Sequence, residues 1–147
     1  MKIMPTRILG IDYGLARIGI SLSDESKILA SPLMIFAAEK KSENTAVKLL
    51  EFLQKHQSEH HYSIEQIVIG LPLMMNGKVG LLADEVKHFV EELRKLTPIP
   101  IVFWDERLTT VQAERSLRES SMSRKKRAKV VDTIAAVIIL QSFLDSR

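Results

Sequence analysis

Apolar residues near the start of the chain fall into three runs, each about as long as a β-strand. The runs cover residues 7–12, 18–23 and 27–36, and Gly14 lies in the connection between the first two. Pro32 interrupts the third run, which is typical of an edge or bulged strand because proline cannot donate a hydrogen bond to a neighbouring strand. The pattern therefore predicts a three-stranded antiparallel opening.

Helical and strand patterns then alternate. Apolar residues recur at i, i+3, i+4 and i+7 over residues 44–56, and the same spacing returns over 82–93. This spacing predicts two amphipathic helices, each buried along one face. Short apolar runs at 67–70 and 101–104 predict a buried strand after each of the two helices.

Two further helices are expected after the fifth strand. Thr109 and Gln112 have the spacing of a capping box, which predicts a helix start just after residues 105–107. The last helix is expected over roughly 126–144. The predicted order is βββαβαβαα, an α/β fold in which the later strands pair in parallel. A chain of 147 residues is too short for two ordinary domains, so we expect one domain over residues 1–147.

Composition limits the chemistry and the location of the protein. The chain has no cysteine, which excludes disulfides, thiolate zinc sites and cysteine nucleophiles. A net charge of +3 permits a polyanionic partner without requiring one. The first residues lack the pattern of an export signal, and the longest apolar stretch, 130–140, is far shorter than the roughly 20 residues of a membrane helix. We therefore expect a cytoplasmic protein that does not enter membranes.

Acidic residues occur at three places where a carboxylate could reach a ligand. Asp12 ends an apolar strand, Asp105 and Glu106 follow another, and Asp132 shares a helical face with apolar residues. Burying an unpaired carboxylate costs several kcal/mol, so a metal, another cation or hydrogen bonds should compensate each one. Ordinary alternatives are a turn aspartate at 12, an ion pair with Arg107 or a helix-terminus acid at 105 and 106, and a helix N-cap at 132.

One cleft could collect these acids, because each stands at a strand end or on a buried helix face. Oxygen ligands of this kind suit Mg²⁺ or Mn²⁺. Two such ions about 3.5–4 Å apart could activate a water and stabilise the leaving oxygen of a phosphodiester. The residues predicted to be catalytic and to bind the metal are Asp12, Asp105, Glu106 and Asp132.

A dense basic run precedes Asp132 in the chain. Such runs are usually solvated surface, but this one lies within about two helical turns of a proposed metal ligand. That position would suit contacts with the phosphates flanking a scissile bond. The residues predicted to bind nucleic acid are Arg17, Arg107, Arg124, Lys125, Lys126, Arg127 and Lys129.

Four segments in this order resemble the YqgF family of pre-16S rRNA nucleases, which is also described as a family of Holliday junction resolvases. They are residues 10–14 with 17–19, 70–73, 105–110 and 131–136. The resemblance implies a ribonuclease H-like fold, a mixed five-stranded sheet flanked by helices, with a metal site between the first strand and the last helix. Asp12 and Asp132 match the family's first and last acids. Asp105 and Glu106 match its acidic pair, without indicating which of them reaches the metal.

The resemblance implies a metal-dependent nuclease that processes the 5′ end of pre-16S rRNA. Cleavage of four-way DNA junctions is the alternative enzyme activity, and it would require two active sites and hence a dimer. A nucleotide-binding ATPase is a third hypothesis, because Asp12 with Gly14 and Gly19 also resembles the phosphate segment of actin-like sugar kinases. A non-catalytic RNA-binding ribosome-assembly factor is a fourth. The expected partners are pre-rRNA, branched DNA or a ribosomal particle, with the protein a monomer or a homodimer.

Overall fold

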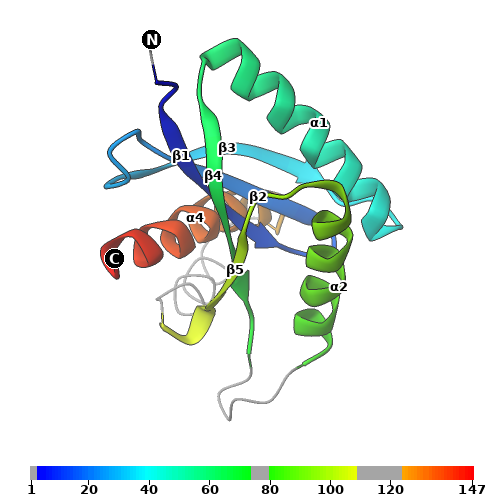
Figure 1. Cartoon of the computed structure of the whole chain (residues 1–147). Helices are drawn as coiled ribbons and strands as arrows, with labels where there is room; N and C mark the ends of the chain where they lie inside the picture. The colour runs from blue at the N-terminus through cyan, green and yellow to red at the C-terminus, as the bar shows by residue number, and fades with distance from the viewer. Residues whose placement is uncertain (1–2, 74–79, 109–123) are drawn as a thin grey trace.

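Five strands form one mixed sheet in the order β3-β2-β1-β4-β5 (Figure 1). The computed structural model describes residues 3–73, 80–108 and 124–147, apart from the side chains of 108 and 124–133. The first three strands pair antiparallel, whereas β4 pairs in parallel with β1, and β5 with β4. The strands are β1 (Thr6–Tyr13), β2 (Arg17–Ser23), β3 (Ala30–Ala37), β4 (Ser63–Leu71) and β5 (Ile101–Asp105).

Helices cover both faces of this sheet. One face carries α1 (Ser42–His60) and α2 (Leu81–Leu96), and α4 (Arg124–Asp145) crosses the other face (Figure 1). A short 3₁₀ helix, η1 (Glu106–Leu108), continues directly from β5. The observed elements confirm the predicted α/β architecture and the order of the five strands. The helix predicted after Thr109 lies outside the described residues.

Alternation along β1 divides its side chains between two cores. Leu9 and Ile11 pack in the core beneath α1 and α2, and Ile8 packs in the core beneath α4. Successive strand residues point to opposite faces, so Gly10 and Asp12 lie on the same face as Ile8. The face covered by α4 therefore carries both the smallest residue of β1 and its only acid.

Close backbone approach fixes α4 against the sheet. A Cβ atom built on Gly10 would lie 2.7 Å from the Cβ of Leu140, so only glycine fits beneath the helix here. The Oγ of Ser21 donates a buried hydrogen bond of 2.7 Å to the backbone oxygen of Ala136. Farther along the helix, the side chain of Gln141 accepts a bond of 2.9 Å from the backbone N–H of Ala30. These contacts fix both the distance and the position of α4.

Among the strands, two predicted starts were wrong by three residues or more. The third strand begins at Ala30 rather than at residue 27, because Lys27 adopts a left-handed conformation with φ of 59°. Asp24 holds this turn by accepting hydrogen bonds from the backbone N–H groups of Ile28 and Leu29. The strand predicted at 67–70 is longer and runs from Ser63 to Leu71. Within the described residues, no helix has the length and apolar character needed to span a bilayer.

Candidate functional site

Asp12 lies at the carboxyl end of β1 and is almost fully buried, with 3% of its surface exposed. The strand continues to Tyr13 and then turns tightly into β2, where the Gly14 N–H donates to the backbone oxygen of Arg17 at 2.9 Å. A Cβ on Gly14 would lie 2.6 Å from that oxygen, so the turn requires glycine. This hairpin places Asp12 opposite Gly19, near the end of the sheet at which the central strand β1 stops.

The two adjacent acids after β5 separate. Glu106 is buried, with 2% of its surface exposed, and a Cβ on Gly70 would lie 3.2 Å from the Cγ of Glu106. The same Cβ would also meet Ile139 of α4, so Gly70 and Glu106 share the face that α4 covers. Gly70 therefore leaves the space into which the glutamate side chain folds.

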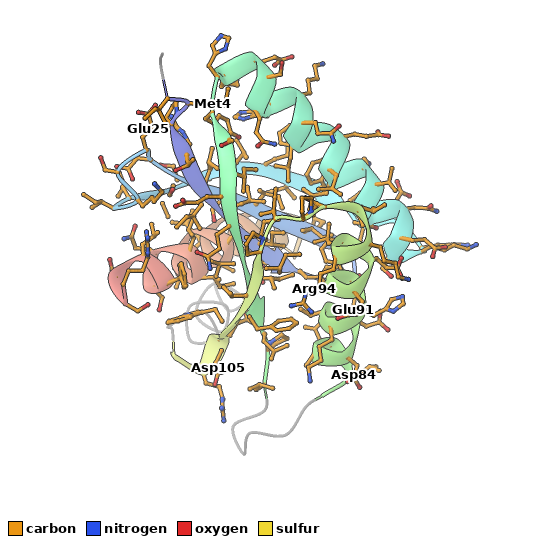
Figure 2. The ribbon with its side chains drawn as sticks, in the orientation of Figure 1. Met4, Glu25, Asp84, Glu91, Arg94 and Asp105 are labelled. Carbon is orange, nitrogen blue, oxygen red and sulfur yellow. The ribbon has the colours of Figure 1, made fainter. Side chains whose placement is uncertain are left out.

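Asp105 instead lies at the end of β5, as Figure 2 shows. There it forms an ion pair with Arg107. The Nη2 of Arg107 lies 2.7 Å from Oδ2, its Nε lies 3.0 Å from both carboxylate oxygens, and its backbone N–H donates to Oδ1 at 2.9 Å. Hydrogen bonding by the Arg107 side chain is the main reason that the pKa of Asp105 is lowered from its ordinary value. Asp105 and Arg107 therefore pair with each other.

Strand pairing brings Asp12 and Glu106 to the same end of the sheet. Ile11 of β1 pairs with Ile69 of β4, which puts Asp12 one residue beyond that pair and beside Gly70. Gly70 in turn pairs with Trp104 of β5, two residues before Glu106. The backbones of β1 and β5 are roughly 10 Å apart, because one strand lies between them. Two buried carboxylates thus flank a glycine on one face.

The start of α4 lies toward the same end of the sheet. Gln141 contacts the first residue of β3, and Ala136 lies near Gly10, so the helix runs opposite to β1. Position 132 is one helical turn before Ala136, or about 6 Å farther toward the Asp12 end. The side chain of Asp132 lies outside the described part of the chain.

The basic residues predicted to bind nucleic acid lie in three separate parts of the fold: on β2, after β5 and at the start of α4. Arg17 precedes Ile18 in β2, and Ile18 packs in the core beneath α1 and α2. Because successive strand residues point to opposite faces, Arg17 lies on the α4 face, near the end of the sheet that holds Asp12. Arg107 is engaged by Asp105, with about 30% of its side chain exposed. The backbone of the basic run forms the first turns of α4, and its side chains are not among those described: Arg124, Lys125, Lys126, Arg127 and Lys129.

The donor chemistry of the site suits a hard divalent cation. Asp12 and Glu106 offer carboxylate oxygens, which Mg²⁺ and Mn²⁺ prefer. Among the side chains that the structure describes, no group of three potential ligands is close enough together to hold an ion. A complete ligand set therefore needs a further donor, and position 132 is the acidic position nearest to that end on α4.

Sequence patterns did not reveal the two glycines that shape this face. Gly10 admits α4, and Gly70 admits the side chain of Glu106. A glycine within a strand is a signal of close approach by another group, and both residues stand inside apolar runs. That signal could have identified the packed face before the structure was known.

The fold and the buried acids define the class of the protein as a ribonuclease H-like α/β domain. A solved structure with the same arrangement is Thermus thermophilus RuvC in complex with a Holliday junction substrate. It matches with a TM-score of 0.55 over 97% of this chain and 95% of that one. Sequence identity is only 12%, so this likeness establishes the fold alone.

Sequence comparison then assigns the family. A model of the RuvX family, described as a Holliday junction resolvase, matches residues 6–146, so the chain belongs to this family of nucleases. A protein of Protochlamydia amoebophila, named "putative pre-16S rRNA nuclease", is 64% identical over 99% of this chain and 97% of its own length. A Caldanaerobacter subterraneus protein of the same name is 49% identical over 96% of this chain and 97% of its own. These matches confirm the resemblance to the YqgF family.

Proposed function

We propose that the protein is a metal-dependent nuclease that hydrolyses a phosphodiester of pre-16S rRNA at the Asp12 end of the sheet. The observation that best supports this proposal is that Asp12 and Glu106 are both nearly fully buried and lie on the same face of the sheet. Gly70, on the strand between them, lies on that face as well. Carboxylates so placed repel each other unless a cation or hydrogen bonds offset the charge. The names of the two relatives support pre-16S rRNA as the substrate.

In this proposal, Asp12, Glu106 and Asp132 are the metal ligands. Bound Mg²⁺ or Mn²⁺ would supply an activated water and positive charge at the leaving oxygen. Helical spacing supports Asp132, because it shares a face with Ala136, which packs on Gly10 beside Asp12. Asp105 holds Arg107 instead of binding the metal, since their ion pair already occupies both carboxylate oxygens.

Carboxylate variants test this assignment. Asp12→Asn, Glu106→Gln and Asp132→Asn should each lower Mn²⁺- or Mg²⁺-dependent cleavage of a pre-16S rRNA fragment by more than about 100-fold, because each removes ligand charge at nearly constant volume. Asp105→Asn is the matched control and should retain most of the activity. Calorimetric titration with Mn²⁺ should show the same ranking for metal affinity.

Two results would contradict the assignment. If Asp12→Asn and Asp132→Asn both cut as wild type does, the metal site is elsewhere. If Asp105→Asn is inactive while Glu106→Gln is active, the two neighbouring acids have been exchanged. Metal binding without cleavage of any RNA or DNA would instead favour a non-catalytic RNA-binding assembly factor.

The basic run at the start of α4 is proposed to hold substrate phosphates. Replacing Lys126 and Lys129 with Gln should weaken RNA binding and reduce the slope of log affinity against log salt by about 0.7 per lost contact. The matched control replaces Lys55 and Lys95, which are exposed on α1 and α2, with the same charge change. Equal slopes in both double variants would show that the run is solvated surface.

Cleavage of four-way DNA junctions is the second candidate function. The family description and the likeness to RuvC bound to a Holliday junction favour it. Symmetric resolution needs two active sites, and therefore a dimer of this chain. Cleavage of an RNA fragment by a protein that sediments as a monomer would support the first function, whereas paired symmetric nicks by a dimer would support the second.

A further inference from the structure

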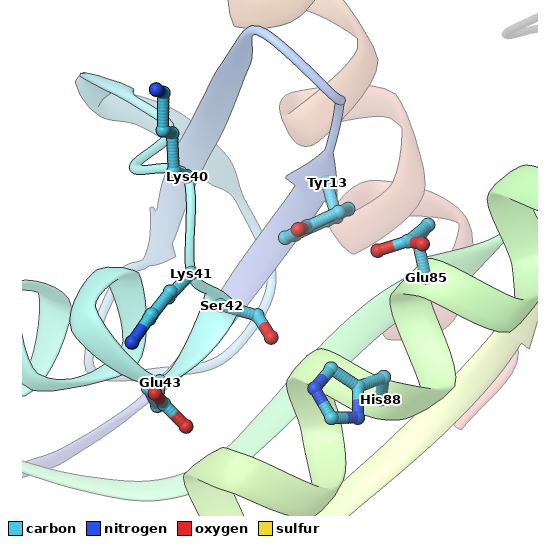
Figure 3. Close-up of a pocket in the computed structure, with 7 residues that line it drawn as sticks. All are labelled: Tyr13, Lys40, Lys41, Ser42, Glu43, Glu85 and His88. Atoms are coloured by element: carbon cyan, nitrogen blue, oxygen red, sulfur yellow. The ribbon is translucent and has the colours of Figure 1, made fainter.

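A polar pocket of about 420 Å³ opens on the sheet face opposite α4 (Figure 3). Three elements form it: Tyr13 at the end of β1, residues 40–43 at the start of α1, and Glu85 and His88 on α2. Its volume lies within the range of small-molecule sites. The carboxylates described above use the other face, so this pocket plays no part in the proposed hydrolysis itself.

Tyr13 is a buried residue with a polar group directed into the pocket. Only 7% of its surface is exposed, and its ring packs against Phe89 with ring centroids 4.7 Å apart. Among the described residues its hydroxyl has no hydrogen-bond partner, and in Figure 3 it points toward the start of α1. The Tyr13 hydroxyl therefore opens to the pocket, where it can donate a hydrogen bond to a ligand acceptor.

The start of α1 offers further donors to the same space. Its cap residue, Lys41, makes no side-chain capping bond, and the first bonds of the helix begin from Asn44 and Thr45. The N–H groups of the first helical residues thus remain for an outside acceptor, at the positive end of the helix dipole. Lys40 and Lys41 line the pocket and form no ion pair within the described residues.

The pocket also provides acceptors. Glu85 carries a carboxylate on α2, and Glu43 carries another beside Ser42 at the start of α1, so two acids balance the two lysines (Figure 3). A bare phosphate leaves both carboxylates without a hydrogen-bond donor, whereas a nucleotide carries an anionic phosphate together with N–H donors on its base. Its phosphate suits the lysines, the helix start and the Tyr13 hydroxyl, and base N–H groups suit the carboxylates. Guanine presents two adjacent N–H donors on one edge, which match one carboxylate.

We propose that this pocket binds one nucleotide of the substrate strand, beside the nucleotide that carries the scissile bond. Tyr13 directly follows Asp12, so their Cα atoms are about 3.8 Å apart while their side chains lie on opposite faces. A single strand crossing the end of the sheet would pass from one site to the other. This inference rests on the proposed nuclease function for its substrate, but binding in the pocket requires no metal and no cleavage.

Titration with guanosine 5′-monophosphate in metal-free buffer tests the pocket directly. Amide signals of residues 42, 43 and 88 should shift in ¹⁵N–¹H NMR spectra as the nucleotide saturates the site. Tyr13→Phe removes only the hydroxyl and should weaken affinity about tenfold, because that hydroxyl bonds a charged phosphate. Lys41→Gln should weaken it as well and leaves the buried ring untouched.

Matched controls carry the same changes outside the pocket. Tyr62→Phe alters a buried tyrosine whose hydroxyl lies 2.8 Å from Nδ1 of His56, and Lys55→Gln alters an exposed lysine of α1. Both should bind the nucleotide as wild type does. No shift at millimolar nucleotide, or equal affinity in Tyr13→Phe, Lys41→Gln and wild type, would overturn the inference. Inorganic phosphate binding as tightly as the nucleotide would also overturn it.

The pocket and the proposed hydrolysis can fail separately. Asp12→Asn should bind the mononucleotide with unchanged affinity, because its carboxylate lies on the other face. Cleavage of RNA by a protein that gives no shift in the pocket overturns this inference alone. Nucleotide binding in the pocket of a protein that cuts no nucleic acid supports the pocket and overturns the proposed hydrolysis.

Discussion

Replacing Gly70 with alanine should disturb stability and the site through two different neighbours. The new Cβ would lie 2.5 Å from the Cδ1 of Ile139 and 3.2 Å from the Cγ of Glu106. Ordinary contact begins near 3.4 Å, so the Ile139 methyl must move by about 1 Å in a fully buried core. Overpacking of this kind costs about 1–3 kcal/mol. The reduced freedom of the unfolded chain offsets about 0.4–1 kcal/mol of this cost, so the middle of the two ranges gives a net loss of about 1 kcal/mol.

A second variant isolates the clash. Ile139→Val removes Cδ1 and alone should cost about 0.5–1.5 kcal/mol. In the double variant the alanine methyl takes the vacated space, so the two losses should cancel in large part instead of adding. Urea unfolding followed by circular dichroism measures all four proteins, with an unchanged m-value as the condition for comparison. Simple additivity, or a Gly70→Ala protein as stable as wild type, would refute the packing argument.

The effect of Gly70→Ala on activity should depend on the contact with Glu106 and not on the contact with Ile139. The contact at 3.2 Å obliges the glutamate side chain to shift by a few tenths of an ångström. Small misplacements in a reacting geometry are costly, and we expect cleavage to fall by on the order of tenfold. The double variant should regain stability but retain this defect. Recovery of activity together with stability would show that the Glu106 contact does not matter.

The other predictions concern the second glycine and the ion pair beside the site. Gly10→Ala should lower the free energy of unfolding by about 1–3 kcal/mol, because the new Cβ meets the Cβ of Leu140, which cannot move aside as the end of a flexible side chain can. Urea unfolding measures this change, and an unchanged unfolding midpoint would contradict the prediction. The lowered pKa of Asp105 means that its pairing with Arg107 stabilises the fold above pH 3.8, its ordinary value, and is lost as pH falls through the lower folded value. Thermal unfolding between pH 2 and 6 should therefore show a smaller acid-induced loss in Arg107→Gln than in wild type, and parallel curves would contradict this reasoning.

Hydrophobic periodicity predicted the order of the strands and the helix on each side of β4, because core burial imposes those patterns. Local conformations were harder to predict. Lys27 turns left-handed where the apolar run suggested a strand, and only the bonds to Asp24 explain this. The acids at 105 and 106 could not be separated, because the face on which each lies depends on where β5 ends and on the space left by Gly70.

The pocket around Tyr13 left no sequence signal. Its residues come from one strand and two helices that are separated along the chain, and no short motif joins them. The resemblance to a family identified Asp12 from its neighbours in sequence, but the same segment carries Tyr13 without indicating a role for it. Sequence reasoning therefore predicted acidic residues for the candidate site, which remains a prediction, and missed the space on the other side of the sheet.

The packing of α4 has a consequence for how the chain acquires its shape during synthesis. The bond from Ser21 to Ala136 joins residues 115 positions apart, and the bond between Ala30 and Gln141 spans 111. Because α4 follows every strand in chain order, the hairpins can form early while their second face stays uncovered. Pairings of such long sequence separation form slowly, and an uncovered apolar face is prone to aggregate. The acids therefore reach their packed surroundings only at the end of folding, so partly made chains should not cut the RNA around them.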